Sequence, residues 1–102
     1  MATLTALYHA PADPKAFDDY YAATHVPLIR RVPGLRALEV SRGPVMSLQG
    51  ASPYHKVANL RFDTMADLKA AVVTAEGQEA AADLANFASA GVTVLVYETE
   101  TP

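Results

Sequence analysis

His25 is the residue whose type and setting most favour chemistry. It follows a run of aromatic residues and precedes Pro27 by two positions. An imidazole titrates near neutral pH and can act as a general acid or base. Tyr21 stands one helical turn earlier, where its phenol can orient the imidazole, so His25 and Tyr21 are the candidate catalytic residues. The alternative is a helix-end histidine that bonds a carbonyl group left free by Pro27.

Aromatic and aliphatic side chains near His25 are suited to a small apolar ligand. We expect a mostly apolar pocket between helices and sheet, with His25 as its polar group and Tyr21 on its wall. The predicted ligand-binding residues are Phe17, Tyr20, Leu28 and Phe87. A second interpretation holds for Tyr20 and Tyr21, in which the pair packs in the core with solvated hydroxyls.

The other two histidines, His9 and His55, are predicted near the ends of neighbouring antiparallel strands, where their imidazoles approach each other. About eleven helical residues separate Pro14 from His25, a length of ~17 Å that takes His25 toward the other end of the sheet. We therefore predict no metal site, and the chain has no cysteine. It also has no glycine-rich phosphate loop and no nucleophile elbow, which predicts no nucleotide, flavin or nicotinamide cofactor.

Residue patterns predict the elements that position these side chains. Alternation of polar and apolar residues predicts strands over residues 3–9, 35–42, 54–62 and 92–98. The first helix begins after the N-cap residue Asp13. Pro27 is expected to kink or stop it and to move Val26 out of helical geometry. A second helix begins at the capping box of residues 64–67, is interrupted at residues 76–77 and resumes over residues 78–90.

The order βαββαβ predicts an α+β, ferredoxin-like split βαβ fold. A four-stranded antiparallel sheet then carries both helices on one face, and residues 1–102 form a single domain. The expected helix-facing set is Leu4, Ala6, Tyr8, Leu38, Val40, Ala58, Leu60, Phe62, Val92, Val94 and Val96.

The opposite face of the predicted sheet is too apolar for open water and too polar for a dry core. Its residues are Thr5, Leu7, Ala37, Glu39, Val57, Asn59, Arg61, Leu95 and Tyr97. A second copy of the chain packed on this face would resolve the conflict, which predicts a homodimer. Glu39 and Arg61 are expected to form a structural pair there, the alternative being a clamp on a ligand.

Charge and composition argue against several classes of partner. The formal net charge is −3, and the eight lysines and arginines are scattered along the chain. Nucleic acid is therefore not an expected partner. No apolar run approaches ~18 residues and no basic leader is visible, so we predict a cytoplasmic protein with no membrane partner.

Several short motifs together resemble the EthD family, and the resemblance covers nearly the whole chain. The motifs are Phe17, Tyr20, Tyr21, residues 24–28 (THVPL), 32–35 (VPGL), 40–43 (VSRG), 52–55 (SPYH) and 83–88 (DLANFA). The resemblance implies a dimeric α+β barrel, in which two ferredoxin-like protomers pack sheet to sheet. The family is labelled a reductase or oxidoreductase. It is named for a protein needed for ethyl tert-butyl ether degradation alongside a cytochrome P450 system.

The resemblance leaves three functions open, because a fold does not fix an activity. In the first, the protein is a cofactor-independent oxidoreductase or isomerase. It would act on a small hydrophobic, quinone-like or carbonyl compound, with His25 as general acid or base. In the second, it is a non-catalytic binding or accessory module for a partner oxidoreductase of a degradation pathway. The third is a purely structural dimer.

Overall fold

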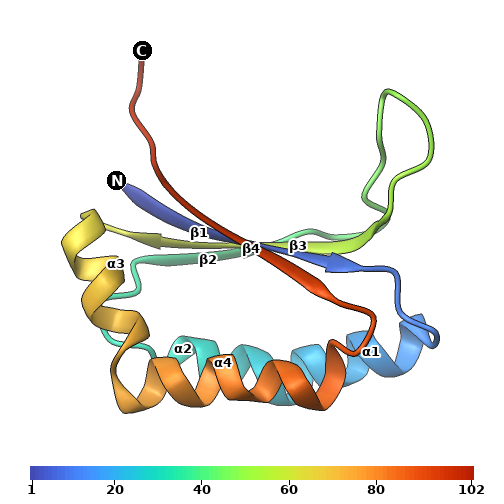
Figure 1. The fold of residues 1–102 in the computed structure, drawn as a ribbon, viewed down its shortest axis with the longest axis horizontal. Helices are drawn as coiled ribbons and strands as arrows, with labels where there is room; N and C mark the ends of the chain where they lie inside the picture. Colours follow the sequence, from blue (N-terminus) through green and yellow to red (C-terminus); the bar gives the residue numbers. More distant parts are fainter.

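The computed structural model describes residues 1–102 and has the predicted α+β architecture (Figure 1). Four strands form one antiparallel sheet in the order β2-β3-β1-β4, and the helices lie in a single layer on one face. In chain order the elements are β1 (Ala2–His9), α1 (Pro14–Tyr20), η1 (Tyr21–His25), α2 (Val26–Arg30), β2 (Ala37–Val40), β3 (Tyr54–Phe62), α3 (Met65–Val72), α4 (Ala75–Phe87) and β4 (Val92–Glu98).

The first helical segment passes through Pro27 without stopping. Val26 keeps helical angles (φ −57°, ψ −46°), so the expectation that it would leave helical geometry is wrong. The segment instead widens into the π-helical turn η1, closed by the Val26 N–H donating to the Tyr21 carbonyl. The wider turn gives room to the proline ring, which in a regular α-helix would crowd the Ala23 carbonyl. His25 therefore lies at a backbone irregularity inside a continuous helix.

The second helical segment breaks earlier than predicted. Helix α3 ends at Val72, and Thr74 caps α4 by accepting a hydrogen bond from the Gly77 N–H at 3.0 Å. Gly77 thus lies in the first turn of α4 and does not interrupt it. It also lies against the end of α3, where a Cβ atom would overlap the Ala71 carbonyl oxygen, so only glycine allows this close turn.

The register of the sheet gives its two faces different characters. Tyr8 and Phe62 are fully buried on the helix side. On the outer face Leu95 and Tyr97 remain 47% and 42% exposed. The predicted Glu39–Arg61 pair forms at 2.8 Å, diagonally, because Glu39 lies opposite Asn59. None of the helices is long and apolar enough to span a membrane.

Candidate functional site

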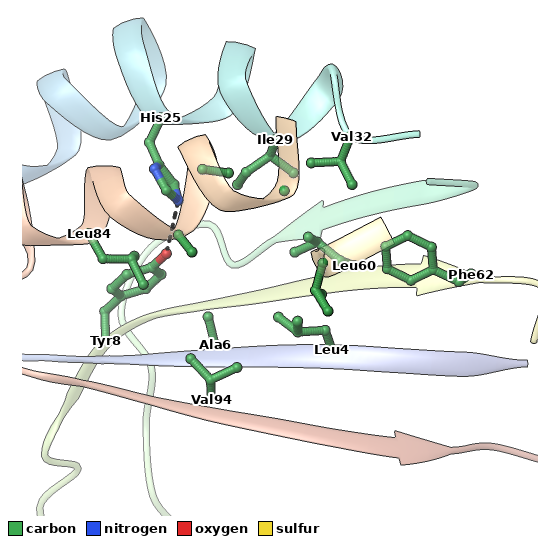
Figure 2. A pocket seen from close by; sticks show the side chains of 14 residues that line it. Leu4, Ala6, Tyr8, His25, Ile29, Val32, Leu60, Phe62, Leu84 and Val94 are labelled. Carbon is green, nitrogen blue, oxygen red and sulfur yellow. Dashed lines mark hydrogen bonds between the residues drawn. The ribbon is translucent and has the colours of Figure 1, made fainter. Parts of the chain in front are cut away.

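His25 lies buried between the helix layer and the sheet, facing a residue from each. Its Nδ1 is 2.9 Å from Asp83 Oδ2, and its Nε2 is 3.5 Å from the Tyr8 hydroxyl. The last contact appears in Figure 2, where the imidazole points from the helix toward the phenol on β1. His25 comes from the π-helical turn, Asp83 from the middle of α4 and Tyr8 from the end of β1. Three elements that are distant in sequence therefore converge on one imidazole.

Asp83 uses its two carboxylate oxygens for different partners. Oδ2 faces His25, whereas Oδ1 accepts hydrogen bonds from the Tyr20 hydroxyl at 2.6 Å and from Asn86 Nδ2 at 3.0 Å. Burial opposes ionisation, but these three bonds outweigh it and lower the pKa of Asp83 below its usual value. Asp83 is therefore a carboxylate near neutral pH. It fixes the tautomer of His25, because its oxygen accepts the proton on Nδ1.

The same environment sets the protonation of His25 and Tyr8. Burial lowers the pKa of His25 and outweighs the opposing attraction of Asp83, so the imidazole is neutral near pH 7. Burial also raises the pKa of Tyr8 well above its usual range, so its phenol stays protonated. With Nδ1–H directed to Asp83, Nε2 carries no proton, and its lone pair accepts only the long hydrogen bond from the Tyr8 hydroxyl at 3.5 Å. The cluster thus combines a base with a neutral hydrogen-bond donor.

A cavity of about 150 Å³ lies beside this cluster, between sheet and helices (Figure 2). Its polar side-chain atoms belong to His25 and Tyr8, and its remaining wall is apolar apart from Gly77. The wall consists of Leu4, Ala6, Tyr8, His25, Ile29, Val32, Leu60, Phe62, Val72, Gly77, Ala80, Ala81, Leu84 and Val94. Val72 and Val94 are 41% and 46% exposed, which places the mouth of the cavity between α3 and the edge strand β4.

A pocket between helices and sheet thus exists with His25 among its polar residues, but its wall contains none of the other predicted residues, Phe17, Tyr20, Tyr21, Leu28 and Phe87. Phe17 and Phe87 belong to an adjacent aromatic cluster, with ring centroids 5.2 Å apart. Tyr20 stacks on Phe87 and bonds Asp83, and Leu28 lies partly buried outside the cavity wall. Phe17, Tyr20 and Phe87 instead border a second, more open hollow of about 370 Å³ beside α1.

Tyr21 does not orient His25 as predicted. The two rings are 5.4 Å apart without a hydrogen bond between them. Burial raises the pKa of Tyr21 to about 12. Its hydroxyl lies near that of Tyr8 and influences its pKa, yet has no partner at hydrogen-bond geometry. Asp83 is the residue that orients the imidazole, and the predicted bond from His25 to a freed carbonyl does not form.

Sequence reasoning assigned no role to Asp83 and only a packing role to Tyr8. A signal for Asp83 was present, because it lies four residues before Phe87 among the inward-facing positions of a helix rich in alanine. A carboxylate at such a position needs a buried partner. Tyr8 carried a weaker signal, since a tyrosine on an apolar strand face is compatible with packing alone.

The remaining histidines take separate partners. A β-bulge leaves His55 as the extra residue opposite Tyr8 and His9, and its Nε2 is 2.8 Å from Asp18 Oδ1 on α1. His9 instead lies 3.3 Å from the Thr93 hydroxyl. His9 and His55 therefore bond different residues on different elements. No group of three or more histidine or acidic side chains is arranged to hold a metal ion.

Comparison with known proteins identifies relatives over nearly the full length of the chain. Residues 9–91 match the EthD domain. A Rhodococcus erythropolis protein, described as an uncharacterized 11.0 kDa protein in the thcB-thcC intergenic region, is 43% identical, with 99% of this chain and 97% of that protein covered. The crystal structure of an ethyl tert-butyl ether d (ethd) family protein from Bacillus halodurans C-125 is 36% identical, with a TM-score of 0.89 and 98% and 99% of the two chains covered.

More distant structures share the fold. SnoaB, a cofactor-independent oxygenase from Streptomyces nogalater, is 14% identical with a TM-score of 0.68 over 99% of this chain and 94% of its own. Structures from Jannaschia sp. CCS1 and Thermobifida fusca, described as dimeric ferredoxin-like proteins, have TM-scores of 0.64 and 0.69 at 22% and 14% identity. Each covers 96% of this chain, with 97% and 90% of its own length matched.

Proposed function

The chain belongs to the EthD family, and we propose that it is a cofactor-independent acid–base catalyst acting on a small hydrophobic carbonyl or quinone-like compound. The compound occupies the cavity with its oxygen toward His25 and Tyr8. The observation that carries this proposal is the orientation of His25: Asp83 holds Nδ1–H at 2.9 Å, which leaves Nε2 as a base at the polar end of an apolar cavity.

The proposed chemistry is proton transfer beside a carbonyl group. Nε2 of His25 removes a proton from the carbon next to the carbonyl, and the electron pair of that C–H bond moves onto the carbonyl oxygen. The Tyr8 hydroxyl donates a hydrogen bond to the resulting enolate oxygen, where charge develops in a dry environment. Asp83 stabilises the imidazolium that forms. Return of the proton to the same carbon or to another atom of the enolate completes an exchange or an isomerisation.

The oxidoreductase form of the proposal uses the same first step. Removal of a phenolic proton by His25 gives an electron-rich phenolate, whose ring carbon bonds dioxygen as the oxidant. The imidazolium returns the proton to the resulting peroxide, and loss of its O–O bond together with the C–H bond at that carbon releases water and leaves a quinone. SnoaB, a cofactor-independent oxygenase with the same fold, is a precedent for this form. In both forms Asp83 orients the imidazole and Tyr8 supplies the phenol, the two roles predicted for Tyr21. Tyr20 bonds Asp83, and Phe17 and Phe87 pack beside the cluster.

Deuterium uptake by cyclohexanone in D₂O tests the base directly. The protein is expected to speed incorporation at the carbons next to the carbonyl, and His25→Gln should reduce the protein-dependent rate by ~10²-fold or more. His55→Gln is the matched control, since it removes another histidine bonded to an aspartate, and its rate should stay within about twofold. Should His25→Gln fold poorly in thermal melts, Tyr8→Phe gives a second readout, with an expected loss of ~10-fold. A His25→Gln rate equal to that of the unmodified protein would overturn the proposal.

A binding or accessory role is the second candidate. The 3.5 Å contact between Tyr8 and Nε2 favours it, because a cavity whose polar groups already face each other can hold a neutral compound without proton transfer. Cyclohexanone that shifts the His25 NMR resonance without gaining deuterium would support this role over catalysis.

We also propose that the protein is a homodimer joined through the outer face of its sheet. Leu95 and Tyr97 are half-exposed there, around a polar centre in which Thr5 hydrogen-bonds Asn59 at 2.7 Å. The loop between β2 and β3 projects from the same side of the sheet (Figure 1) and carries the exposed Met46. Covering such an apolar surface favours association.

Light scattering tests the dimer, which should have twice the 10.8 kDa mass of one chain. Leu95→Asp should give a monomer, because association would bury an unpaired charge. Val73→Asp, at an exposed position at the end of α3, is the control and should remain dimeric. A monomeric unmodified protein at micromolar concentration would rule the dimer out.

A further inference from the structure

We infer that the cavity selects compounds of a single ring whose oxygen atoms lie along one edge, and discriminates against rings with oxygens at opposite ends. This rests on the proposed function and narrows its substrate class. A phenol, a catechol or a cyclic ketone fits the description, whereas a para-hydroquinone or para-quinone of equal size does not. The argument has two parts, the size of the cavity and the distribution of its polar atoms.

The size of the cavity limits the enclosed part of a ligand to one ring. Its volume of about 150 Å³ equals that of an engineered apolar protein cavity that takes up benzene. Close-packed side chains such as Ile29 and Leu60 surround it, and these are 3% and 9% exposed. A fused second ring inside these walls would overpack the core, so it could lie only in the exposed mouth between Val72 and Val94, where it gains less apolar contact.

The polar side-chain atoms of the cavity are confined to one end. Nε2 of His25 and the Tyr8 hydroxyl lie 3.5 Å apart, so two neighbouring oxygens of a ligand, or one shared oxygen, can engage both. Farther along β1 from Tyr8, the sheet side of the wall is apolar. There Ala6 lies opposite Val94, and Leu4 lies opposite Leu60. Beyond His25 and Tyr8 the wall presents apolar side chains and Gly77.

An oxygen at the opposite end of a ring would lose its hydration without gaining a partner. Figure 2 shows Val32 and Phe62 at the end remote from His25 and Tyr8, and both are buried. A hydroxyl buried among such groups is disfavoured, because no side-chain donor or acceptor there replaces water. A second oxygen next to the first meets no such penalty, since it stays near Nε2 and Tyr8.

Isomeric ligands test this inference without any change of size. Binding of phenol, catechol and hydroquinone is followed by NMR, through the methyl resonances of Leu60 and Val94 and the ring resonances of His25. Phenol and catechol should bind at least ~10-fold more tightly than hydroquinone, and 2-naphthol should bind at least ~10-fold more weakly than phenol.

A substitution at the remote end sharpens the test. Val32 lies just beyond the end of α2, and Figure 2 places it at the end of the cavity remote from His25, where the second oxygen of hydroquinone would lie. Val32→Thr places a hydroxyl there with little change of shape, and should strengthen hydroquinone binding ~5-fold or more while leaving phenol unchanged. Val73→Thr, at an exposed residue outside the cavity wall, is the matched control and should change neither affinity.

The outcomes separate this inference from the catalytic proposal. Hydroquinone binding within about threefold of phenol, with cyclohexanone exchange still dependent on His25, would overturn the inference alone. A preserved preference for phenol, with exchange unaffected by His25→Gln, would overturn the catalytic proposal alone. Absence of any shift in the cavity methyl resonances with all four compounds, together with cyclohexanone exchange unaffected by His25→Gln, would overturn both. The comparison of isomers uses the unmodified protein, so it stands even if Val32→Thr is poorly folded.

Discussion

The molecule contains two histidine–aspartate pairs of nearly equal length in very different surroundings. His25 meets Asp83 at 2.9 Å, with side chains that are 4% and 6% exposed. His55 meets Asp18 at 2.8 Å, with side chains that are 21% and 46% exposed. Distance alone would give the two pairs the same importance. Their burial, the nitrogen they use and their further partners separate them.

The two pairs use different nitrogens of the imidazole ring, so only in the buried pair does Nε2 lack an aspartate partner. His25 uses Nδ1 for its aspartate and directs Nε2 toward Tyr8, while His55 spends Nε2 on Asp18. The neutral donors Tyr20 and Asn86 hold Asp83, which therefore keeps an uncompensated negative charge for a developing imidazolium.

Asp18 already has a cation, because Lys56 Nζ lies 3.3 Å from it. Burial favours the protonated form of Asp18, but the bonds from His55 and Lys56 outweigh this effect and lower the pKa of Asp18. A histidine–aspartate contact thus indicates proton chemistry only where the second ring nitrogen faces a cavity and the carboxylate lacks a competing cation.

The largest difference between the pairs should appear in stability. Asp83→Ala removes the acceptor of three donors in a buried setting, and should lower the free energy of unfolding by about 3 kcal/mol or more. Asp18→Ala breaks a solvent-screened pair and should cost at most about 1 kcal/mol. Chemical denaturation of both variants measures the two costs. Equal costs would mean that burial does not distinguish the pairs.

An intermediate difference should appear in deuterium uptake by cyclohexanone. If the amide of Asp83→Asn turns its oxygen to His25, its NH₂ meets the donors of Tyr20 and Asn86. If it turns the other way, His25 must carry its proton on Nε2 and loses its basic atom. The protein-dependent rate should fall by ~10- to 100-fold, while Asp18→Asn should leave it within about twofold. A rate unchanged in Asp83→Asn would show that Asp83 does not set the tautomer.

The smallest effect should be a pH dependence of stability that belongs to the buried pair. The pKa of His25 is lower in the folded chain than its ordinary value of about 6.5, so the unfolded chain binds more protons between these values. The free energy of unfolding should therefore fall as the pH is lowered from about 6.5 toward the pKa of folded His25. Denaturation at several pH values should show this fall diminished in His25→Gln and retained in His55→Gln.

Much of the fold could be predicted because its determinants are local. Strand alternation and the caps at Asp13 and Thr64 place the elements, and the structure confirms both caps through hydrogen bonds of 3.1 Å. The sequence pattern places the break between α3 and α4 at Gly77, whereas the structure has it at residues 73–74. A glycine is required at position 77 because the backbone packs against the Ala71 carbonyl at the end of α3, a contact that the local pattern does not reveal.

The site was only half predictable, because its geometry depends on contacts between distant segments. The neighbouring aromatic residues and Pro27 identify His25 as a candidate. Asp83 lies 58 residues away, and no local pattern links the two residues. The aromatic residues near His25 were assigned to the cavity by proximity in sequence. In the folded chain they pack against one another, and small aliphatic residues of α4, such as Ala80, take the cavity wall.

The π-helical turn makes the position of His25 sensitive to the number of residues in the first helical segment. Phe17, Tyr21, His25 and Ile29 follow one another at intervals of four and are all buried, although four residues of a regular α-helix overshoot a full turn by ~40°. The five-residue turn absorbs part of that drift. Loss of a single codon for Ala22 or Ala23, both exposed, would remove the extra residue of this turn and place Tyr21 and His25 three positions apart, a spacing that falls ~60° short of a full turn in a regular α-helix. Such a deletion would keep every functional side chain and still shift His25 relative to Asp83 and Tyr8. The spacing of these residues is therefore as necessary to the site as their identity.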